Sequence, residues 1–172
     1  MISYILAVLS GGLLLFLDQY TKSLVVANFK LAESKQFIDG FINFVYIHNK
    51  GGAWGLLNGR TWLLLSLTIV IMLVCIALII KHGLKNKLMF WSISLIIFGG
   101  IGNMLDRILR DGNVVDFIHL EFMPSFPVFN IADCSIVIGG ALLILYFILD
   151  ILRENKEKKN NARLKDNGND AD

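Results

Sequence analysis

Two aspartates, Asp116 and Asp133, lie in apolar stretches that read V-V-D-F and F-N-I-A-D. An ionised side chain at the edge of a hydrocarbon layer is costly, so such residues by default indicate a functional site. If the loop between them folds back and brings the carboxyl groups together, like-charge repulsion leaves one protonated near neutral pH and the other ionised. The pair would then offer both an acid and a base. In the alternative interpretation, Asp133 caps a helix and Asp116 lies in a turn, and both are inert.

The composition is that of a membrane protein. Of 172 residues, 55% are hydrophobic, and the mean hydropathy is +0.63, which is too apolar for a soluble domain of this size. The formal net charge of +2 is too small to indicate nucleic-acid binding, and no basic stripe with interleaved aromatic residues occurs. The two cysteines and three histidines are scattered without metal-ligand spacing, so we expect no metal and no other cofactor.

Four apolar stretches are long enough to cross a bilayer as helices. They are residues 2–27, 61–80, 88–105 and 130–152. The first lacks a basic start and a small-residue cleavage site, so we interpret it as a retained span and not as a signal peptide. The expected fold is mainly α-helical, with residues 1–153 forming a four-helix membrane domain. Residues 154–172, rich in lysine, asparagine and glutamate, are expected to form a disordered cytoplasmic tail.

Two segments outside the membrane connect these spans on one side. In the first, Asp39-Gly40 lies between aromatic and β-branched residues, which predicts a hairpin and a small sheet on the membrane surface. The motif N-K-G-G-A-W-G follows at residues 49–55. Its three glycines permit unusual backbone angles or close approach of a ligand, although they would equally fit an ordinary turn. The second segment, residues 111–129, contains two prolines and is expected to be a second outer loop.

Polar residues from distant parts of the chain are expected to meet. With four spans, the end of the first, the end of the third and the start of the fourth lie in one leaflet, as does the first outer segment. One side of the membrane therefore collects Asp18, Lys22, Asn49, Asn103, Asp106, Arg107, Asp116, Asn130 and Asp133. Such clustering favours a functional site. Taken alone, Asp18 and Lys22 could form a structural ion pair four residues apart.

The distribution of basic residues gives the expected orientation. Lysine and arginine number nine on the segments at one side, counting the loop after the second span and the tail, and seven at the other. The positive-inside rule therefore favours both termini in the cytoplasm. The polar cluster would then lie near the extracytoplasmic face.

Five short motifs together resemble lipoprotein signal peptidase, the signal peptidase II family of bacterial membrane aspartyl peptidases. They are D-Q-Y-T-K from Asp18, N-K-G-G-A-W-G from Asn49, G-N-M-L-D-R from Gly102, V-V-D-F from Val114 and F-N-I-A-D from Phe129. They occur in the order typical of the family, and the resemblance covers nearly everything before the tail. One departure is Gly52, where the family more often has alanine.

The resemblance implies a hydrolase of the bacterial cytoplasmic membrane. It would be an aspartic endopeptidase that removes signal peptides from diacylglyceryl-modified prolipoproteins, cutting on the N-terminal side of the lipidated cysteine. Asp116 and Asp133 would be the catalytic dyad. The substrate-binding or structural residues would be Asp18, Lys22, Asn49, Gly51, Ala53, Asn103, Asp106, Arg107 and Asn130. The implied partners are the prolipoprotein and membrane lipid, with a monomer favoured.

Two other functions fit the same residues. A small ion or proton transporter also carries intramembrane aspartate, lysine and asparagine, but the second and fourth spans have no charge through their cores. A non-catalytic membrane protein that binds lipid or lipoprotein could have the same fold. Substitution of either aspartate distinguishes it from an enzyme.

Overall fold

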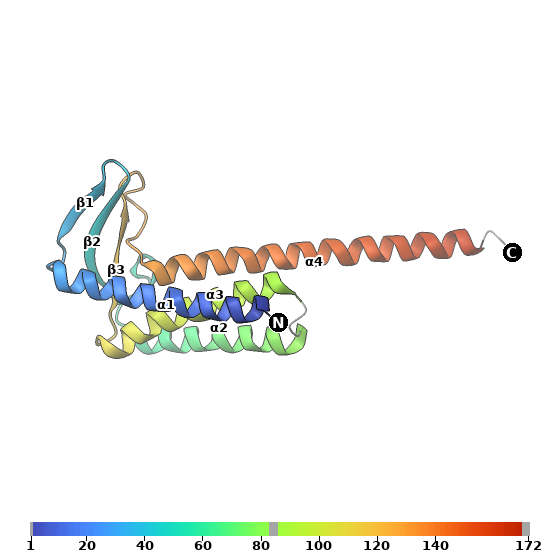
Figure 1. Ribbon diagram of the computed structural model, residues 1–172, viewed down its shortest axis with the longest axis horizontal. Coiled ribbons are helices and arrows are strands. Elements are labelled where there is room, and N and C mark those ends of the chain that lie inside the picture. Colours follow the sequence, from blue (N-terminus) through green and yellow to red (C-terminus); the bar gives the residue numbers. More distant parts are fainter. Residues whose placement is uncertain (1, 83–85, 170–172) are drawn as a thin grey trace.

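Four helices lie side by side in the computed structural model, and a small sheet stands across one end of them (Figure 1). The structure describes residues 2–82 and 86–169, with backbone alone for residues 53 and 162–169. The helices are α1 (Ile2–Asn28), α2 (Thr61–His82), α3 (Lys87–Leu109) and α4 (Ile131–Asn169). Each contains a stretch long and apolar enough to cross a membrane. The prediction of four membrane spans is therefore confirmed.

Helix α3 is the centre of the bundle and contacts each of the other three helices. Glycines let α3 and α4 approach closely, as small residues do between membrane helices. A Cβ on Gly99 would lie 2.6 Å from the Ala132 carbonyl oxygen, and one on Gly139 would lie 2.7 Å from that of Ser92. By contrast, α2 is apolar on all sides and largely exposed, as expected of a helix that faces lipid.

The sheet has three antiparallel strands in the order β1-β2-β3. They are β1 (Ser34–Ile38), β2 (Ile42–Asn49) and β3 (Val114–Leu120). The predicted hairpin at Asp39-Gly40 is present, and Gly40 has the left-handed φ of 67° that such a turn requires.

The second outer segment is present, and within it residues 114–120 form β3, a strand that no sequence pattern predicts. The run V-V-D-F-I-H-L is short and becomes a strand because β2 supplies its hydrogen-bond partners, pairing Ile47 with Asp116 and Asn49 with Val114. The two prolines follow Leu120 and do not interrupt the pairing. A first outer segment and a second one, far apart in sequence, are thus joined in one sheet.

The glycine-rich motif folds into a tight loop around η1 (Ala53–Gly55). Gly52 and Gly55 have left-handed φ angles of 69° and 68°, which glycine adopts without steric penalty. A Cβ on Gly51 would lie 2.7 Å from the Gly55 Cα. The unusual backbone angles that the motif predicts are therefore present, and the close approach at Gly51 is to backbone.

The segment from residue 154 is the expected tail, and the structure describes it as far as residue 169. Helix α4 continues through it to Asn169. An ion pair between Arg153 and Glu157, one turn apart with Nε and Oε1 separated by 3.0 Å, supports the helical form locally. The side chains of residues 154–161 are all exposed. Lys85, one of the basic residues used to orient the chain, lies outside the described residues.

Candidate functional site

Asp116 is the third residue of β3, and it is only 1% exposed. The pairing of Asn49 with Val114 makes Asn49 a diagonal neighbour of Asp116 on the adjacent strand. The Asn49 Nδ2 donates to Asp116 Oδ2 at 2.8 Å, and the Asn130 Nδ2 donates to Asp116 Oδ1 at 2.6 Å. Both carboxylate oxygens therefore have a side-chain donor.

Asp133 lies in the first turn of α4 and is partly exposed. Its Oδ2 accepts from the backbone N–H of Asn130 at 3.1 Å, while Asn130 Oδ1 accepts from the backbone N–H of Asp133 at 2.9 Å. This reciprocal pair is the arrangement of a capping box. The other carboxylate oxygen, Oδ1, accepts from Asn103 Nδ2 at 2.7 Å. Asp133 does take part in a helix cap, but Asp116 lies in a strand and not in the turn that the inert alternative requires.

Asn130 connects the two aspartates. Its side chain contacts Asp116 and its backbone N–H contacts Asp133. The same side-chain Nδ2 also donates to Asn103 Oδ1 at 3.1 Å. The two carboxyl groups, which are 17 residues apart in the sequence, are thus joined by one asparagine in one hydrogen-bonded network.

A buried ionic cluster supports this network from α1 and α3. The Lys22 ammonium lies 2.8 Å from Asp18 Oδ2 and 3.2 Å from Asp106 Oδ2, and it donates to Asn103 Oδ1 at 3.0 Å. All three charged side chains are at most 1% exposed. Buried charges are tolerated when they are paired and hydrogen-bonded in this way.

The two aspartates of the ionic cluster also hold the elements that carry Asp116 and Asp133. Asp18 Oδ1 accepts from the backbone N–H of Ala132 at 2.9 Å, at the start of α4. Asp106 Oδ2 accepts from the backbone N–H of Val115 at 3.0 Å, next to Asp116. The cluster therefore fixes the position of each catalytic candidate through the adjacent residue.

Gln19 also belongs to the cluster, although its residue type and spacing do not predict this. Its Nε2 lies 3.1 Å from both Asp18 Oδ2 and the Gly102 carbonyl oxygen, and 3.3 Å from Asp106 Oδ1. Its position beside Asp18 in the D-Q-Y-T-K motif is the one signal that could have indicated it.

Arg107 lies beside the network and has an N–H group that can still donate a hydrogen bond. Its side chain is 9% exposed, and its Nη1 donates to the Asn103 carbonyl oxygen at 3.3 Å. Its Nε is buried and has no hydrogen-bond partner among the described residues. The guanidinium and Asn103 line a cavity of about 160 Å³ between α2, α3 and α4. The remaining wall is mainly apolar and includes Ile71, Met72, Ile96 and Ile136.

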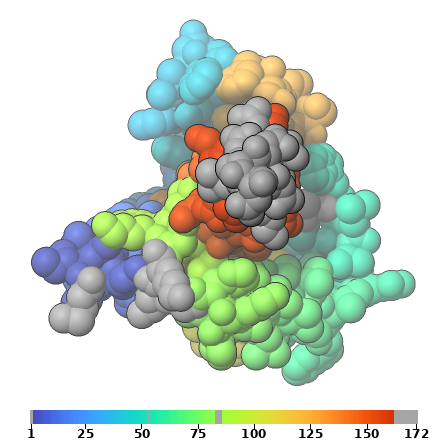
Figure 2. Space-filling model, turned by 90° about the vertical axis from the view of Figure 1, so that its right-hand side faces the viewer, coloured from blue at the N-terminus to red at the C-terminus, as the bar shows by residue number. Residues whose placement is uncertain are grey.

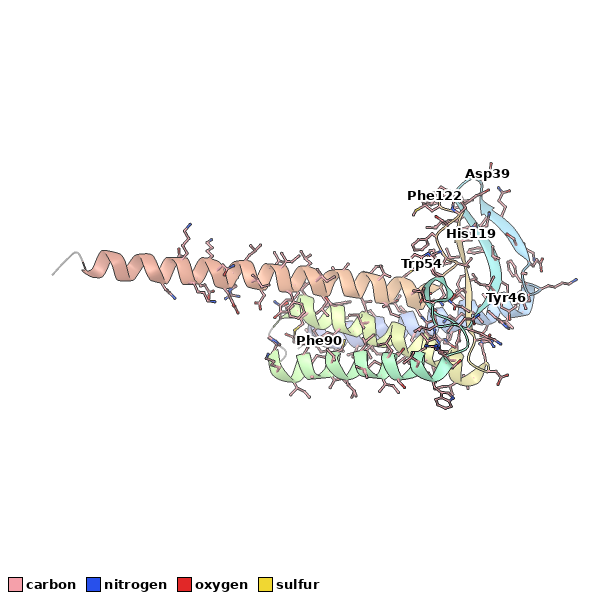
Figure 3. All side chains as sticks on the ribbon, turned by 180° about the vertical axis from the view of Figure 1, so that it is seen from behind. Asp39, Tyr46, Trp54, Phe90, His119 and Phe122 are labelled. Atoms are coloured by element: carbon pink, nitrogen blue, oxygen red, sulfur yellow. The ribbon has the colours of Figure 1, made fainter. Side chains whose placement is uncertain are left out.

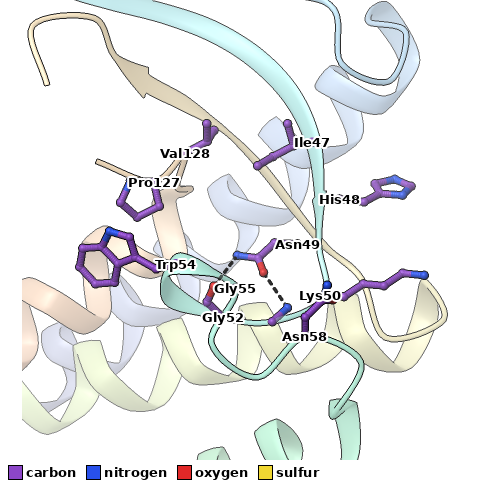
Figure 4. Close-up of a pocket in the computed structure, with 11 residues that line it drawn as sticks. Ile47, His48, Asn49, Lys50, Gly52, Trp54, Gly55, Asn58, Pro127 and Val128 are labelled. Carbon is purple, nitrogen blue, oxygen red and sulfur yellow. Dashed lines mark hydrogen bonds between the residues drawn. The ribbon is translucent and has the colours of Figure 1, made fainter. Parts of the chain in front are cut away.

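A larger pocket of about 500 Å³ opens on the outer side of the site. The glycine-rich loop forms one wall, and Pro127 and Val128 of the second outer segment form another (Figure 4). Asn49 is held in the loop because its Oδ1 accepts from the Gly51 N–H at 2.9 Å and its Nδ2 reaches the Gly52 carbonyl oxygen at 3.2 Å. The backbone of Ala53 continues the same loop within η1.

The environment of Asp116 makes its carboxyl group titrate near neutral pH. Burial, together with the charge of Asp133, raises its pKa from 3.8 to about 7, while the hydrogen bonds from Asn49 and Asn130 oppose the shift. A group with this pKa has both protonation states available near neutral pH. It can therefore accept or supply a proton.

The residues proposed from sequence thus lie around one site. Hydrogen bonds and ion pairs connect Asp18, Lys22, Asn49, Asn103, Asp106, Asp116, Asn130 and Asp133. Arg107 adjoins them through Asn103, and the backbone of Gly51 supports Asn49.

Comparison with known proteins identifies the family. A family model described as signal peptidase (SPase) II matches residues 11–149. The lipoprotein signal peptidase of Enterococcus faecalis is 40% identical over 152 residues, which is 88% of this chain and 92% of that protein. That of Bacillus pumilus is 42% identical over 135 residues, covering 78% and 86%. A solved bacterial membrane enzyme superposes with a TM-score of 0.79 at 36% identity, covering 84% and 88%. The chain therefore belongs to the signal peptidase II family of aspartic peptidases and is a multi-pass membrane enzyme.

Proposed function

We propose that this enzyme cleaves diacylglyceryl-modified prolipoproteins on the N-terminal side of the lipidated cysteine, using Asp116 and Asp133 as its catalytic pair. Membership of the family supports the coarser statement, removal of signal peptides from prolipoproteins. The observation that supports Asp116 and Asp133 as the catalytic pair is that Asn130 contacts both carboxyl groups. Two carboxyl groups joined through one asparagine would share a proton near neutral pH and so provide an acid and a base together.

The reaction needs no covalent intermediate. The ionised carboxylate takes a proton from water, whose oxygen adds to the scissile carbonyl carbon, while the protonated carboxyl group donates to the carbonyl oxygen. The C–N bond then breaks, and the departing nitrogen takes the proton that the first carboxylate had accepted. Proton return from the new carboxyl product restores the shared proton. The assignment of base and acid is a property of the pair.

The neighbouring amides and Arg107 have separate tasks. Asn49, Asn103 and Asn130 hold the carboxylate oxygens in place, so the reacting groups need no rearrangement when substrate arrives. The Arg107 guanidinium can donate to a substrate backbone carbonyl, because its Nε has no hydrogen-bond partner among the described residues. From the cavity that it lines between α2, α3 and α4, the guanidinium would hold the peptide beside the dyad.

The location suits a substrate that is part lipid. The dyad lies where β3 and the first turn of α4 meet, at the end of the membrane spans. The lipid chains of the modified cysteine can remain in the bilayer while the scissile bond meets water. With both termini in the cytoplasm, as the basic residues favour, the site lies near the extracytoplasmic face.

The direct test is cleavage of one precursor in lipidated and unlipidated form. Asp116→Asn and Asp133→Asn should each abolish cleavage and leave binding of the lipidated precursor intact, because each removes one half of the shared-proton pair. Asp150→Asn, on the same helix as Asp133 but outside the network, is the matched control and should cleave normally. Normal cleavage by either dyad variant overturns the proposal. Binding of the precursor by the wild type without cleavage would favour the non-catalytic alternative.

A further inference from the structure

The end of the sheet farthest from Asp116 carries a group of exposed apolar side chains. This aromatic tip consists of Phe37, Ile38, Phe41, Phe122 and Met123, each between 45% and 61% exposed. Phe41 and Phe122 stack with ring centroids 4.8 Å apart and planes 13° from parallel. The backbone N–H of Glu121 donates to the Phe41 carbonyl oxygen at 3.0 Å. The hairpin turn and the segment after β3 are therefore joined into one unit.

The tip lies outside the outline of the helix bundle. The sheet runs across the helix axes and not along them (Figure 1). Viewed along those axes, the hairpin and the segment after β3 project past α4 (Figure 2). Along the direction of the helix axes, Phe122 lies nearer to the helices than Asp39, which is at the hairpin turn (Figure 3). If the tip is followed along the helix axes toward the spans, the space reached lies beside α4 and is not filled by the bundle.

The neighbouring surface faces lipid. Val137 and Ile138, in the second turn of α4, are exposed within a span that is apolar enough to cross the membrane. Trp62, in the first turn of α2, is 83% exposed at the same end of the bundle. Exposed tryptophan at the end of a span is typical of the boundary between lipid and water. The tip and these exposed apolar residues of α4 and α2 therefore lie at the same end of the bundle, where the second and fourth spans begin.

We propose that the aromatic tip inserts into the outer leaflet beside α4, with the glycerol and upper acyl region of phospholipids as its partner. Aromatic side chains favour this region because it is apolar on one side and wet on the other. The carboxylates of Asp39 and Glu121 remain in the headgroup layer. The inference is independent of the proposed reaction.

Insertion would hold the sheet at both ends. The inner end of β3 is held by the bond from Val115 to Asp106, and the outer end would be held by lipid. Between these two points lie Asp116 and the wall of the outer pocket. The bilayer would then help to fix the height of the sheet above the dyad.

The test places a fluorophore at the tip in nanodiscs that hold one copy of the protein. Cys75 and Cys134 are replaced by alanine, and an environment-sensitive NBD label is attached through Met123→Cys, which leaves Phe41 and Phe122 stacked. Asp39→Cys provides the matched control on the side away from the helices. Lipids with a nitroxide on the upper acyl chain should quench the label at position 123 more than the label at position 39. Aqueous iodide should show the opposite order.

A second variant tests the aromatic side chains themselves. Adding Phe41→Ser and Phe122→Ser to the labelled Met123→Cys protein should abolish the lipid quenching and restore iodide quenching. Equal iodide access at positions 39 and 123 would overturn the proposal. So would protection of position 123 from both quenchers, which would mean that protein covers the tip, and so would lipid quenching that survives the loss of both phenylalanines.

Discussion

The two ends of α3 and α4 are held together by different chemistry. At one end, Met89, Ile93 and Ile96 of α3 pack with Tyr146 of α4 in a buried apolar cluster that also includes Cys75. At the other end, the same two helices meet through the network of Asn103, Asn130 and Asp133. Apolar packing tolerates small changes of shape, whereas a buried polar network fails when one member loses its partner. The first end therefore contributes to stability alone, whereas the second end contributes to stability and also positions reactive groups.

The largest effect should follow from breaking the ionic cluster at the polar end. Lys22→Met leaves Asp18 and Asp106 buried without their ammonium partner, and losing one member of a buried ion pair costs about 3–5 kcal/mol. Thermal unfolding in nanodiscs should show this loss, together with loss of cleavage. Lys22→Met combined with Asp18→Asn should regain part of the stability, because Asp18 has no other cationic partner among the described residues, whereas Asp106 keeps Arg110 at 3.4 Å. Wild-type stability of the single variant would contradict a supporting role for the cluster.

A smaller effect, confined to stability, is expected at the apolar end. Met89 is fully buried, and Met89→Ala should lower the free energy of unfolding by about 2 kcal/mol through the cavity it leaves. The kcat of the folded enzyme should stay unchanged, because none of the hydrogen bonds described for the site involves a residue of this cluster. Measuring unfolding and kcat on one preparation separates the two ends. A matched fall in kcat would show that the ends are coupled.

The helices and their meeting point could be predicted from sequence because a bilayer imposes simple rules. The thickness of the hydrocarbon layer sets the length of a span. Because successive spans cross the membrane in opposite directions, their order decides which loops lie on the same side. Asp18, Asn103 and Asp133 could be brought together in this way without any knowledge of packing. The hairpin at Asp39-Gly40 follows from local turn chemistry.

The parts that could not be predicted depend on partners far away in the sequence. Strand β3 exists because β2 supplies its hydrogen bonds, and its seven residues alone carry no clear periodicity. The backbone N–H groups of Val115 and Ala132 are partners of Asp106 and Asp18, but a backbone donor leaves no trace in residue type. Gln19 has three partners that only the packing of α1 on α3 reveals.

The outer loop offers a sharper test that changes one methyl group. Gly51→Ala would place a Cβ 2.7 Å from the Gly55 Cα, so the loop must shift and carry Asn49 away from Asp116. A misplacement of about 1 Å around the reacting groups lowers kcat by about 10²-fold. Gly12→Ala is the matched control, because no atom of the described residues, apart from the neighbouring backbone of its own helix, lies within 4 Å of the added Cβ, and its kcat should be unchanged. Equal rates for the two variants would mean that the loop does not position the dyad.

The smallest effect is a pH dependence of stability that belongs to Asp116. Its pKa in the folded protein, about 7, lies above the ordinary value of 3.8, so the folded state binds this proton more tightly than the unfolded chain does. The resulting stabilisation is fully present below the ordinary pKa and is lost as the pH rises through about 7. The Asp116→Asn variant has no carboxyl group at this position, so it does not show this loss of stabilisation with rising pH. The Tm of the wild type should therefore fall relative to that of Asp116→Asn between pH 5 and pH 8, whereas the difference between the wild type and Asp150→Asn should stay constant. A difference between the wild type and Asp116→Asn that does not change with pH would show that this carboxyl group stays ionised, and the polar end of the bundle would then lack the shared proton that distinguishes it from the apolar end.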